Sequence, residues 1–133
     1  MKRLILAILF AWKLFFPCIL KAASTPAVGI ASIYAKSFSG RRTASGKRFD
    51  PKQLTAAHRS LPFGSKVRIF NLTNMKFVDV EITDRGPWKK GRILDLSYSA
   101  AQSLGMIRQG VARVIYTPLP YIQLPEAITM SLD

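Results

Sequence analysis

The chain has 133 residues, which is room for one ordinary domain. Its formal net charge is +13, from 20 lysines and arginines against seven aspartates and glutamates. A single cysteine and a single histidine exclude a disulfide framework and a zinc site of the usual His/Cys type. We therefore expect no metal and no cofactor.

The first two dozen residues have the pattern of a secretory signal peptide. Lys2 and Arg3 give a positive start, and an apolar run over residues 4–20 follows. The residues around Ser24 are small, which favours cleavage after it, so that residues 1–24 are removed. Lys13 interrupts a long apolar run, and an uncleaved membrane anchor stays open as the alternative.

Export would change the interpretation of the charge. Without the first 24 residues, 16 basic and seven acidic side chains remain, which gives a net charge of +9. An exported protein rarely meets nucleic acid, so we expect an anionic polymer of the cell envelope as the partner, or a charge that serves only solubility. Cys18 is a candidate lipid-attachment site, but Pro17 and Phe15 depart from the lipoprotein motif.

Short apolar runs separated by turns predict the rest of the fold. Strands are expected over residues 29–35, 67–72, 77–83, 93–96 and 111–117. The secondary-structure type of residues 54–58 stays undecided at this point. The polar residues 37–53 predict a long surface loop. Ser97 or Ser99 caps a short helix that Gly105 ends. This pattern predicts an all-β fold, a compact β-barrel.

The domain limits follow from the same pattern. We predict a barrel domain over residues 25–120, with an irregular, proline-containing tail over residues 121–133. Neither an internal repeat nor a second domain is visible in the sequence.

A carboxylate stands at the end of the most regular strand. Residues 77–83 alternate between apolar and polar side chains, and Gly86 and Pro87 then stop the strand. Asp84 is thereby held at the tip of a strand in a fixed direction. It is either an acid with a catalytic role or a residue that only shapes the turn.

The remaining chemistry is that of carboxylates. The chain has no Gly-x-Ser-x-Gly elbow and no glycine-rich phosphate loop after a strand. The candidate acids are Asp50, Asp84 and Asp95. His58 is their titratable neighbour. For Asp95 we favour a structural role, paired with Arg92 or Arg85, because buried acids are normally paired.

A series of short motifs runs along the chain in a fixed order: Tyr34, Thr43-Ala44-Ser45-Gly46, Phe49-Asp50, Leu54-Thr55-Ala56-Ala57-His58, Leu61-Pro62-Phe63-Gly64, Val67-Arg68, Asn71-Leu72, Asp84-Arg85-Gly86-Pro87, Gly91-Arg92-Ile93-Leu94-Asp95-Leu96-Ser97, Ala100-Ala101 and Leu104-Gly105. Together they resemble the rare lipoprotein A (RlpA) family over about residues 29–117. The resemblance implies a six-stranded double-psi β-barrel, the fold of plant expansins.

The resemblance also implies a function. Active members are lytic transglycosylases, which cut the β-1,4 bond between N-acetylmuramic acid and N-acetylglucosamine and leave 1,6-anhydro ends. The expected partner is then the peptidoglycan glycan strand, and the expected place is the periplasm or cell envelope, with membrane association possible through the N-terminal segment. We expect a monomer. The alternatives are a non-catalytic, expansin-like peptidoglycan-binding domain and an interaction module of an envelope or division complex.

One acid is enough for such a reaction, because the C6 hydroxyl of the substrate is the nucleophile. From the resemblance we predict three catalytic residues: Asp84 as general acid and base, His58 and Asp50. Substrate binding is predicted at Tyr34, Thr43, Ser45, Lys47 and Arg85. For Thr43 and Ser45, a role in shaping the loop is the alternative, and Arg85 either binds sugar or points away from Asp84.

Lys47 departs from the family pattern, in which glutamate usually follows this glycine. A nearby ammonium favours the ionised form of a carboxyl group, so Lys47 would weaken catalysis by Asp84. If the glutamate only holds the loop, little is lost. A second departure is Ile33, where tryptophan is common, and this change removes a surface for sugar stacking.

Overall fold

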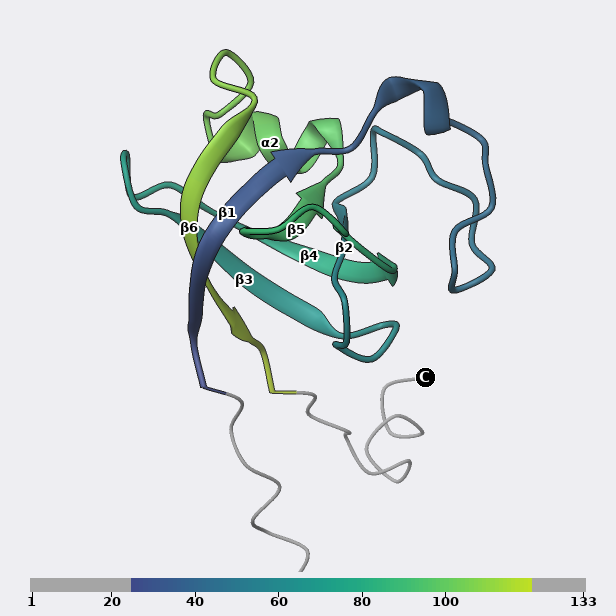
Figure 1. Cartoon of the computed structure of the whole chain (residues 1–133), viewed down its shortest axis with the longest axis horizontal. Coiled ribbons are helices and arrows are strands. Elements are labelled where there is room, and N and C mark those ends of the chain that lie inside the picture. The colour runs from purple at the N-terminus through teal and green to yellow at the C-terminus, as the bar shows by residue number, and fades with distance from the viewer. Residues whose placement is uncertain (1–24, 121–133) are drawn as a thin grey trace, which may run out of the picture.

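The computed structural model describes residues 25–120, and they form a closed barrel of six strands (Figure 1). The strands are β1 (Ala27–Ile33), β2 (Thr55–Ala57), β3 (Lys66–Asn71), β4 (Phe77–Asp84), β5 (Arg92–Leu96) and β6 (Val111–Pro118). The helical elements are the 3-10 helix η1 (Lys36–Phe38) and the helix α2 (Tyr98–Ser103). The all-β class and the six-stranded barrel are confirmed. Residues 54–58, whose secondary structure the sequence left undecided, contain β2.

Several predictions concern segments outside the described residues. These are the signal peptide or anchor over residues 1–24, the lipid attachment at Cys18 and the irregular tail over residues 121–133. Within residues 25–120, neither helical element has the length and apolar character that a membrane crossing requires.

The strand register brings two acids to one side of the barrel. The order around the barrel is β1-β5-β2-β4-β3-β6, with β1 and β5 parallel and β2 and β4 parallel. Ser32 of β1 pairs with Asp95 of β5, Asp95 pairs with Ala57 of β2, and Ala57 pairs with Asp84 of β4. Neighbouring strands lie about 4.8 Å apart, so Asp84 and Asp95 flank Ala57 in one row with Cα atoms about 10 Å apart.

The core fills the barrel in the way that the strand alternation predicts. In β4, the apolar residues Val78, Val80 and Ile82 are buried while the polar residues between them are half-buried. Burying a side chain of this size contributes about 1.5–3 kcal/mol. Helix α2 covers one end of the barrel with its two buried alanines, and the Ser97 hydroxyl caps it by accepting a hydrogen bond from Ala100 N–H at 3.2 Å.

The segment between β1 and β2 leaves the barrel as a folded excursion, seen at the right of Figure 1. After η1, residues 40–49 form a hairpin, which we call the 40–49 hairpin. It is held by hydrogen bonds from Gly40 N–H to the Phe49 carbonyl, from Phe49 N–H to the Arg41 carbonyl and from Thr43 N–H to the Lys47 carbonyl, each 2.8 Å. The predicted long surface loop is therefore ordered, because its backbone groups pair with one another and buried Phe49 anchors it.

Candidate active site

Asp84 is the last residue of β4, and three donors hold its carboxylate. Ala44 N–H and Arg85 N–H both donate to Oδ1 at 2.9 Å, and the Tyr34 hydroxyl donates to Oδ2. The backbone of Asp84 is fixed as well, since its carbonyl accepts a hydrogen bond from His58 N–H at 3.1 Å. Three donors suit an ionised carboxylate, which can only accept.

Tyr34 is positioned by the end of β1 and by two aromatic rings. Its N–H donates to the Leu96 carbonyl at 2.8 Å, and its ring packs against Phe38 and Phe49 with centroid distances of 5.0 and 4.6 Å. Burial is the main reason that the pKa of Tyr34 lies well above its usual range, and the hydrogen bond to Asp84 raises it further. Tyr34 therefore stays protonated and acts as a donor.

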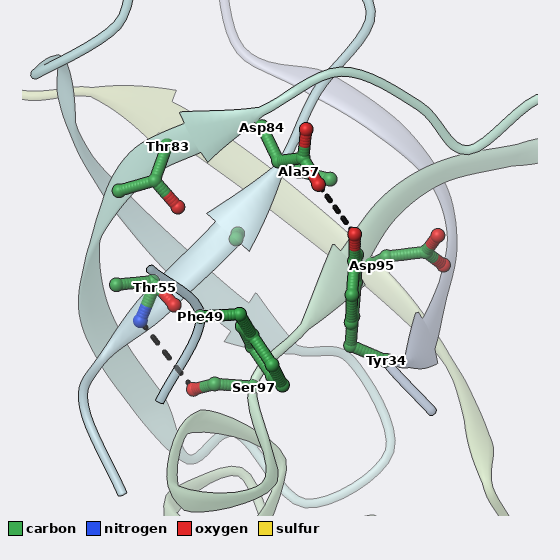
Figure 2. A pocket seen from close by; sticks show the side chains of 9 residues that line it. Tyr34, Phe49, Thr55, Ala57, Thr83, Asp84, Asp95 and Ser97 are labelled. Carbon is green, nitrogen blue, oxygen red and sulfur yellow. Dashed lines mark hydrogen bonds between the residues drawn. The ribbon is translucent and has the colours of Figure 1, made fainter. Parts of the chain in front are cut away.

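A second carboxyl group lies in the same pocket. Figure 2 shows the Tyr34 hydroxyl pointing to Asp84, with Asp95 on the other side of the tyrosine ring. Asp95 accepts a hydrogen bond from the Ser32 hydroxyl, its neighbour in the strand register. The predicted pairing of Asp95 with an arginine is wrong, because β5 turns this side chain toward β1. The pocket itself leaves no room for a water molecule.

The tip of the 40–49 hairpin rests on the end of β4. Ser45 N–H donates to the Thr83 carbonyl at 3.1 Å, beside the contact of Ala44 with Asp84. The Thr43 hydroxyl lies 2.9 Å from that of Ser45 and 2.6 Å from the Lys47 carbonyl. The side chains of Thr43 and Ser45 thus tie the hairpin together, and sugar contact by them stays a prediction.

Lys47 belongs to the 40–49 hairpin, and 63% of its side chain is exposed. Its ammonium pairs with Glu81 at an N–O distance of 2.9 Å. The ammonium is therefore engaged by a neighbouring carboxylate of β4, and the hydrogen bonds to Asp84 come from other residues.

His58 is 8% exposed and lies directly behind the site. Its Nδ1 accepts hydrogen bonds from Ser60 N–H at 3.0 Å and Leu61 N–H at 2.9 Å. Because Nδ1 accepts, the proton sits on Nε2, which donates to the Tyr116 hydroxyl at 2.8 Å. Burial lowers the pKa of His58, and the nearby arginines lower it further. The ring is thus neutral and fully engaged away from the Asp84 carboxylate.

The side chains of Asp50 and Arg85 bind backbone groups of nearby turns. Asp50 is exposed, and its Oδ1 accepts the Lys52 N–H at 2.9 Å, which closes a turn. The Arg85 guanidinium donates to the Leu61 carbonyl at 2.8 Å and lies 3.9 Å from the centroid of the Phe63 ring. The structure therefore brings Tyr34 to Asp84, gives Asp50 a loop contact and points Arg85 away from the carboxylate.

The sequence reasoning did not single out Trp88, whose residue surface is 76% exposed. It lies four residues after Asp84 on a turn that Arg59 holds. The guanidinium of Arg59 donates to the carbonyls of Pro87 at 2.7 Å, Lys89 at 3.1 Å and Arg92 at 3.2 Å. A tryptophan placed between Gly-Pro and two lysines is a signal that could have identified this exposed ring.

Comparisons with known proteins agree on one family. A family model described as lytic transglycolase matches residues 26–116. A protein of Nostoc sp. named "Probable endolytic peptidoglycan transglycosylase RlpA" is 57% identical over 88 residues, which are 65% of this chain and 24% of that protein. "Endolytic peptidoglycan transglycosylase RlpA" of Pasteurella multocida is 52% identical over 86 residues, 65% of this chain and 29% of that protein. The chain spans about a quarter of the length of these relatives.

Solved structures of distant proteins share the fold. A mutant expansin of Clavibacter michiganensis in complex with cellohexaose superposes with a TM-score of 0.60 at 17% identity, over 76% of this chain and 54% of the expansin. The Streptomyces papain inhibitor gives a TM-score of 0.60 at 19% identity, over 74% of this chain and 98% of the inhibitor. At such identities the likeness concerns the barrel alone.

Proposed function

The chain belongs to the lytic transglycolase family, and from this premise we propose that it is an endolytic peptidoglycan transglycosylase. Its reaction would cleave the β-1,4 bond between N-acetylmuramic acid and N-acetylglucosamine. The names of relatives that are 57% and 52% identical support this substrate. The reaction then takes place outside the cytoplasmic membrane, and the apolar N-terminal segment would serve export or anchoring.

In the proposed reaction no water is consumed. A protonated carboxyl donates its proton to the glycosidic oxygen, and the bond from C1 of the muramyl sugar to that oxygen breaks. The C6 hydroxyl oxygen of the same sugar bonds to C1, and its proton passes to the carboxylate, which is thereby restored. The products are a free 4-hydroxyl group and a 1,6-anhydro sugar.

The observation that carries this proposal is the fixed carboxylate of Asp84. Two backbone N–H groups and the Tyr34 hydroxyl set its direction, and rigid positioning of the reacting group is a large part of general acid–base catalysis. We propose Asp84 as the acid and base. Asp95 lies in the same pocket beyond Tyr34 and is the second carboxyl whose part in the reaction has to be tested.

One observation favours a second function, glycan binding without cleavage. The three groups around Asp84 are all hydrogen-bond donors, and they hold the carboxylate as an acceptor, which suits the binding of a sugar hydroxyl. Exposed Trp88 beside this turn would serve either function, because an aromatic face can stack on a sugar ring.

One experiment separates the two functions. The full-length chain is incubated with purified glycan strands, and mass spectrometry looks for 1,6-anhydromuramyl ends. We expect such ends from the native chain and a loss of at least about 100-fold in Asp84→Asn, the usual scale for removing a general acid. Glycan binding in a pull-down without any anhydro ends would overturn the enzyme in favour of the binding module. A matched Asp95→Asn variant shows whether the second carboxyl takes part.

A further inference from the structure

A hollow of about 540 Å³ lies beside the Asp84 pocket, and we call it the Lys36–Lys52 hollow. Its lining consists of Lys36, Ser39, Pro51, Lys52, Tyr98, Ser99 and Gln102. Ligand pockets in proteins usually measure about 300–1,000 Å³, so this hollow has the size of a site for a small group or a sugar unit. It differs from the Asp84 pocket, which has no such space.

Three segments build the hollow, and direct contacts connect them. Ser99 N–H at the start of α2 donates to the Pro51 carbonyl at 3.0 Å. The Lys36 ammonium of η1 lies 5.0 Å from the centroid of the Tyr98 ring. The turn that carries Lys52 is closed by the contact of its N–H with the Asp50 carboxylate. The walls are therefore fixed to one another in the folded chain.

The lining of the hollow carries positive charge alone. Its lining includes two lysines and hydroxyl groups but no acidic residue. Among residues 25–120, the ion pairs are Lys47 with Glu81 and Arg68 with Asp79, so neither ammonium of the hollow is paired. Asp50, two residues before Lys52, keeps its negative charge, but it accepts the Lys52 N–H and forms no ion pair with either ammonium. Two unpaired ammonium groups at one hollow attract an anion.

The hollow adjoins the candidate active site through all three of its segments. Tyr34, Phe49 and Ser97 line the Asp84 pocket, and each is followed within three residues by a residue that lines the hollow. A glycan strand that lies across the mouth of the pocket can therefore place a substituent of a neighbouring sugar in the hollow.

We propose that the Lys36–Lys52 hollow is an anion subsite that binds a carboxylate of the glycan strand, a proposal that rests on peptidoglycan as the substrate. In peptidoglycan a carboxylate comes from one of two sources. It is the lactyl group of a muramyl sugar without a stem peptide, or it belongs to the stem peptide itself. Lys36 and Lys52 supply the charge, and the Tyr98 ring holds the Lys36 ammonium at the lining of the hollow.

The test compares ligands that share a sugar backbone. Dissociation constants of the full-length chain are measured by NMR titration for a peptide-free tetrasaccharide of alternating N-acetylglucosamine and N-acetylmuramic acid, and for chitotetraose, which lacks the lactyl carboxylate. A peptide-bearing tetrasaccharide, whose lactyl group is an amide, is the third ligand. We expect at least one carboxylate-bearing ligand to bind about tenfold more tightly than chitotetraose, an advantage that added salt reduces.

The variants locate the effect. Lys36→Gln combined with Lys52→Gln should remove the preference over chitotetraose, whereas Lys66→Gln combined with Lys76→Gln removes the same charge elsewhere and should preserve it. Preference for the peptide-free ligand alone assigns the lactyl group, and preference for the peptide-bearing ligand assigns the stem peptide. Equal binding of all three ligands, or a preference that survives in Lys36→Gln/Lys52→Gln, overturns the subsite. None of these measurements requires cleavage, so a failure of the proposed reaction is recognised separately.

Discussion

The Asp84 pocket and the Lys36–Lys52 hollow adjoin each other but differ in whether their charged groups have partners within the chain. In the pocket, donors from three segments satisfy one carboxylate, and no space is left for water. In the hollow, two ammonium groups line a large space without a carboxylate. The difference indicates that the pocket is built to hold a group in one direction, whereas the hollow is built to receive a group from outside.

The largest expected effect comes from the support behind the pocket. His58→Ala leaves the N–H groups of Ser60 and Leu61 and the Tyr116 hydroxyl without their partner. Each unsatisfied buried group costs about 1–3 kcal/mol, and water can replace the lost partner of exposed Ser60, so we expect the free energy of unfolding to fall by about 2–4 kcal/mol in chemical denaturation. His58→Asn, whose amide oxygen can accept the two N–H groups, should recover part of this. A fall below about 1 kcal/mol in the alanine variant would contradict the structural role.

Next in size is the loss of one donor inside the pocket. Tyr34→Phe keeps the ring against Phe38 and Phe49 but removes the hydroxyl that donates to Asp84. A hydrogen bond to a charged group contributes about 1.5–3 kcal/mol, so the rate of anhydro-end formation should fall about 10-fold to 100-fold. An unchanged rate would show that the hydrogen bond from the Tyr34 hydroxyl does not contribute to the reaction of Asp84.

Acid pH should lower the stability of the fold through His58, which lies behind the pocket. The pKa of His58 is lowered in the folded chain, so below its ordinary value of 6.5 the unfolded chain binds the proton first. Stability is therefore full above pH 6.5 and falls as the pH drops toward the lowered value, by at most about 1.4 kcal/mol per pH unit. Denaturation of the native chain and His58→Asn between pH 7.5 and pH 5 checks this, because the variant should lose the His58 contribution. An identical slope in both would refute it.

The smallest effect is expected from loss of the ion pair between the 40–49 hairpin and β4. Lys47→Gln removes an exposed ion pair with Glu81, and such pairs contribute about 0–1 kcal/mol. Stability should change by less than about 1 kcal/mol and the rate of anhydro-end formation by less than about twofold. The opposite hypothesis, that Lys47 suppresses Asp84, requires a large gain in Lys47→Glu. Such a gain would show that the ammonium reaches the carboxylate during catalysis.

The sequence predicted the barrel well because its strands carry their own signals. Alternation in residues 77–83 predicts β4, and runs of apolar residues predict β5 and β6. β2 has only three residues, too few for a period to appear, and its type depends on pairing with β4 and β5. Strand existence was therefore predictable, and the pairing of a short strand was not.

The contacts of the site depend on strand pairing and on docking of the hairpin, neither of which local patterns encode. Asp84 was placed correctly at a strand end, because the glycine and proline after it are local signals. The neighbours of Asp95 follow from the row through Ser32 and Ala57, which exists only once the barrel closes. Likewise, Lys47 meets Glu81 only because the hairpin docks beside β4.

The carboxylate of Asp84 is the point at which β1, β4 and the 40–49 hairpin meet. A copy of the chain whose hairpin has come away from β4 loses the donor from Ala44 and the backbone contact of Ser45 with Thr83. Such a copy no longer presents the assembled carboxylate, even if the rest of its barrel is intact. In the proposed transglycosylase, a molecule whose hairpin is undocked or nicked would therefore be inactive, because it lacks the fixed carboxylate.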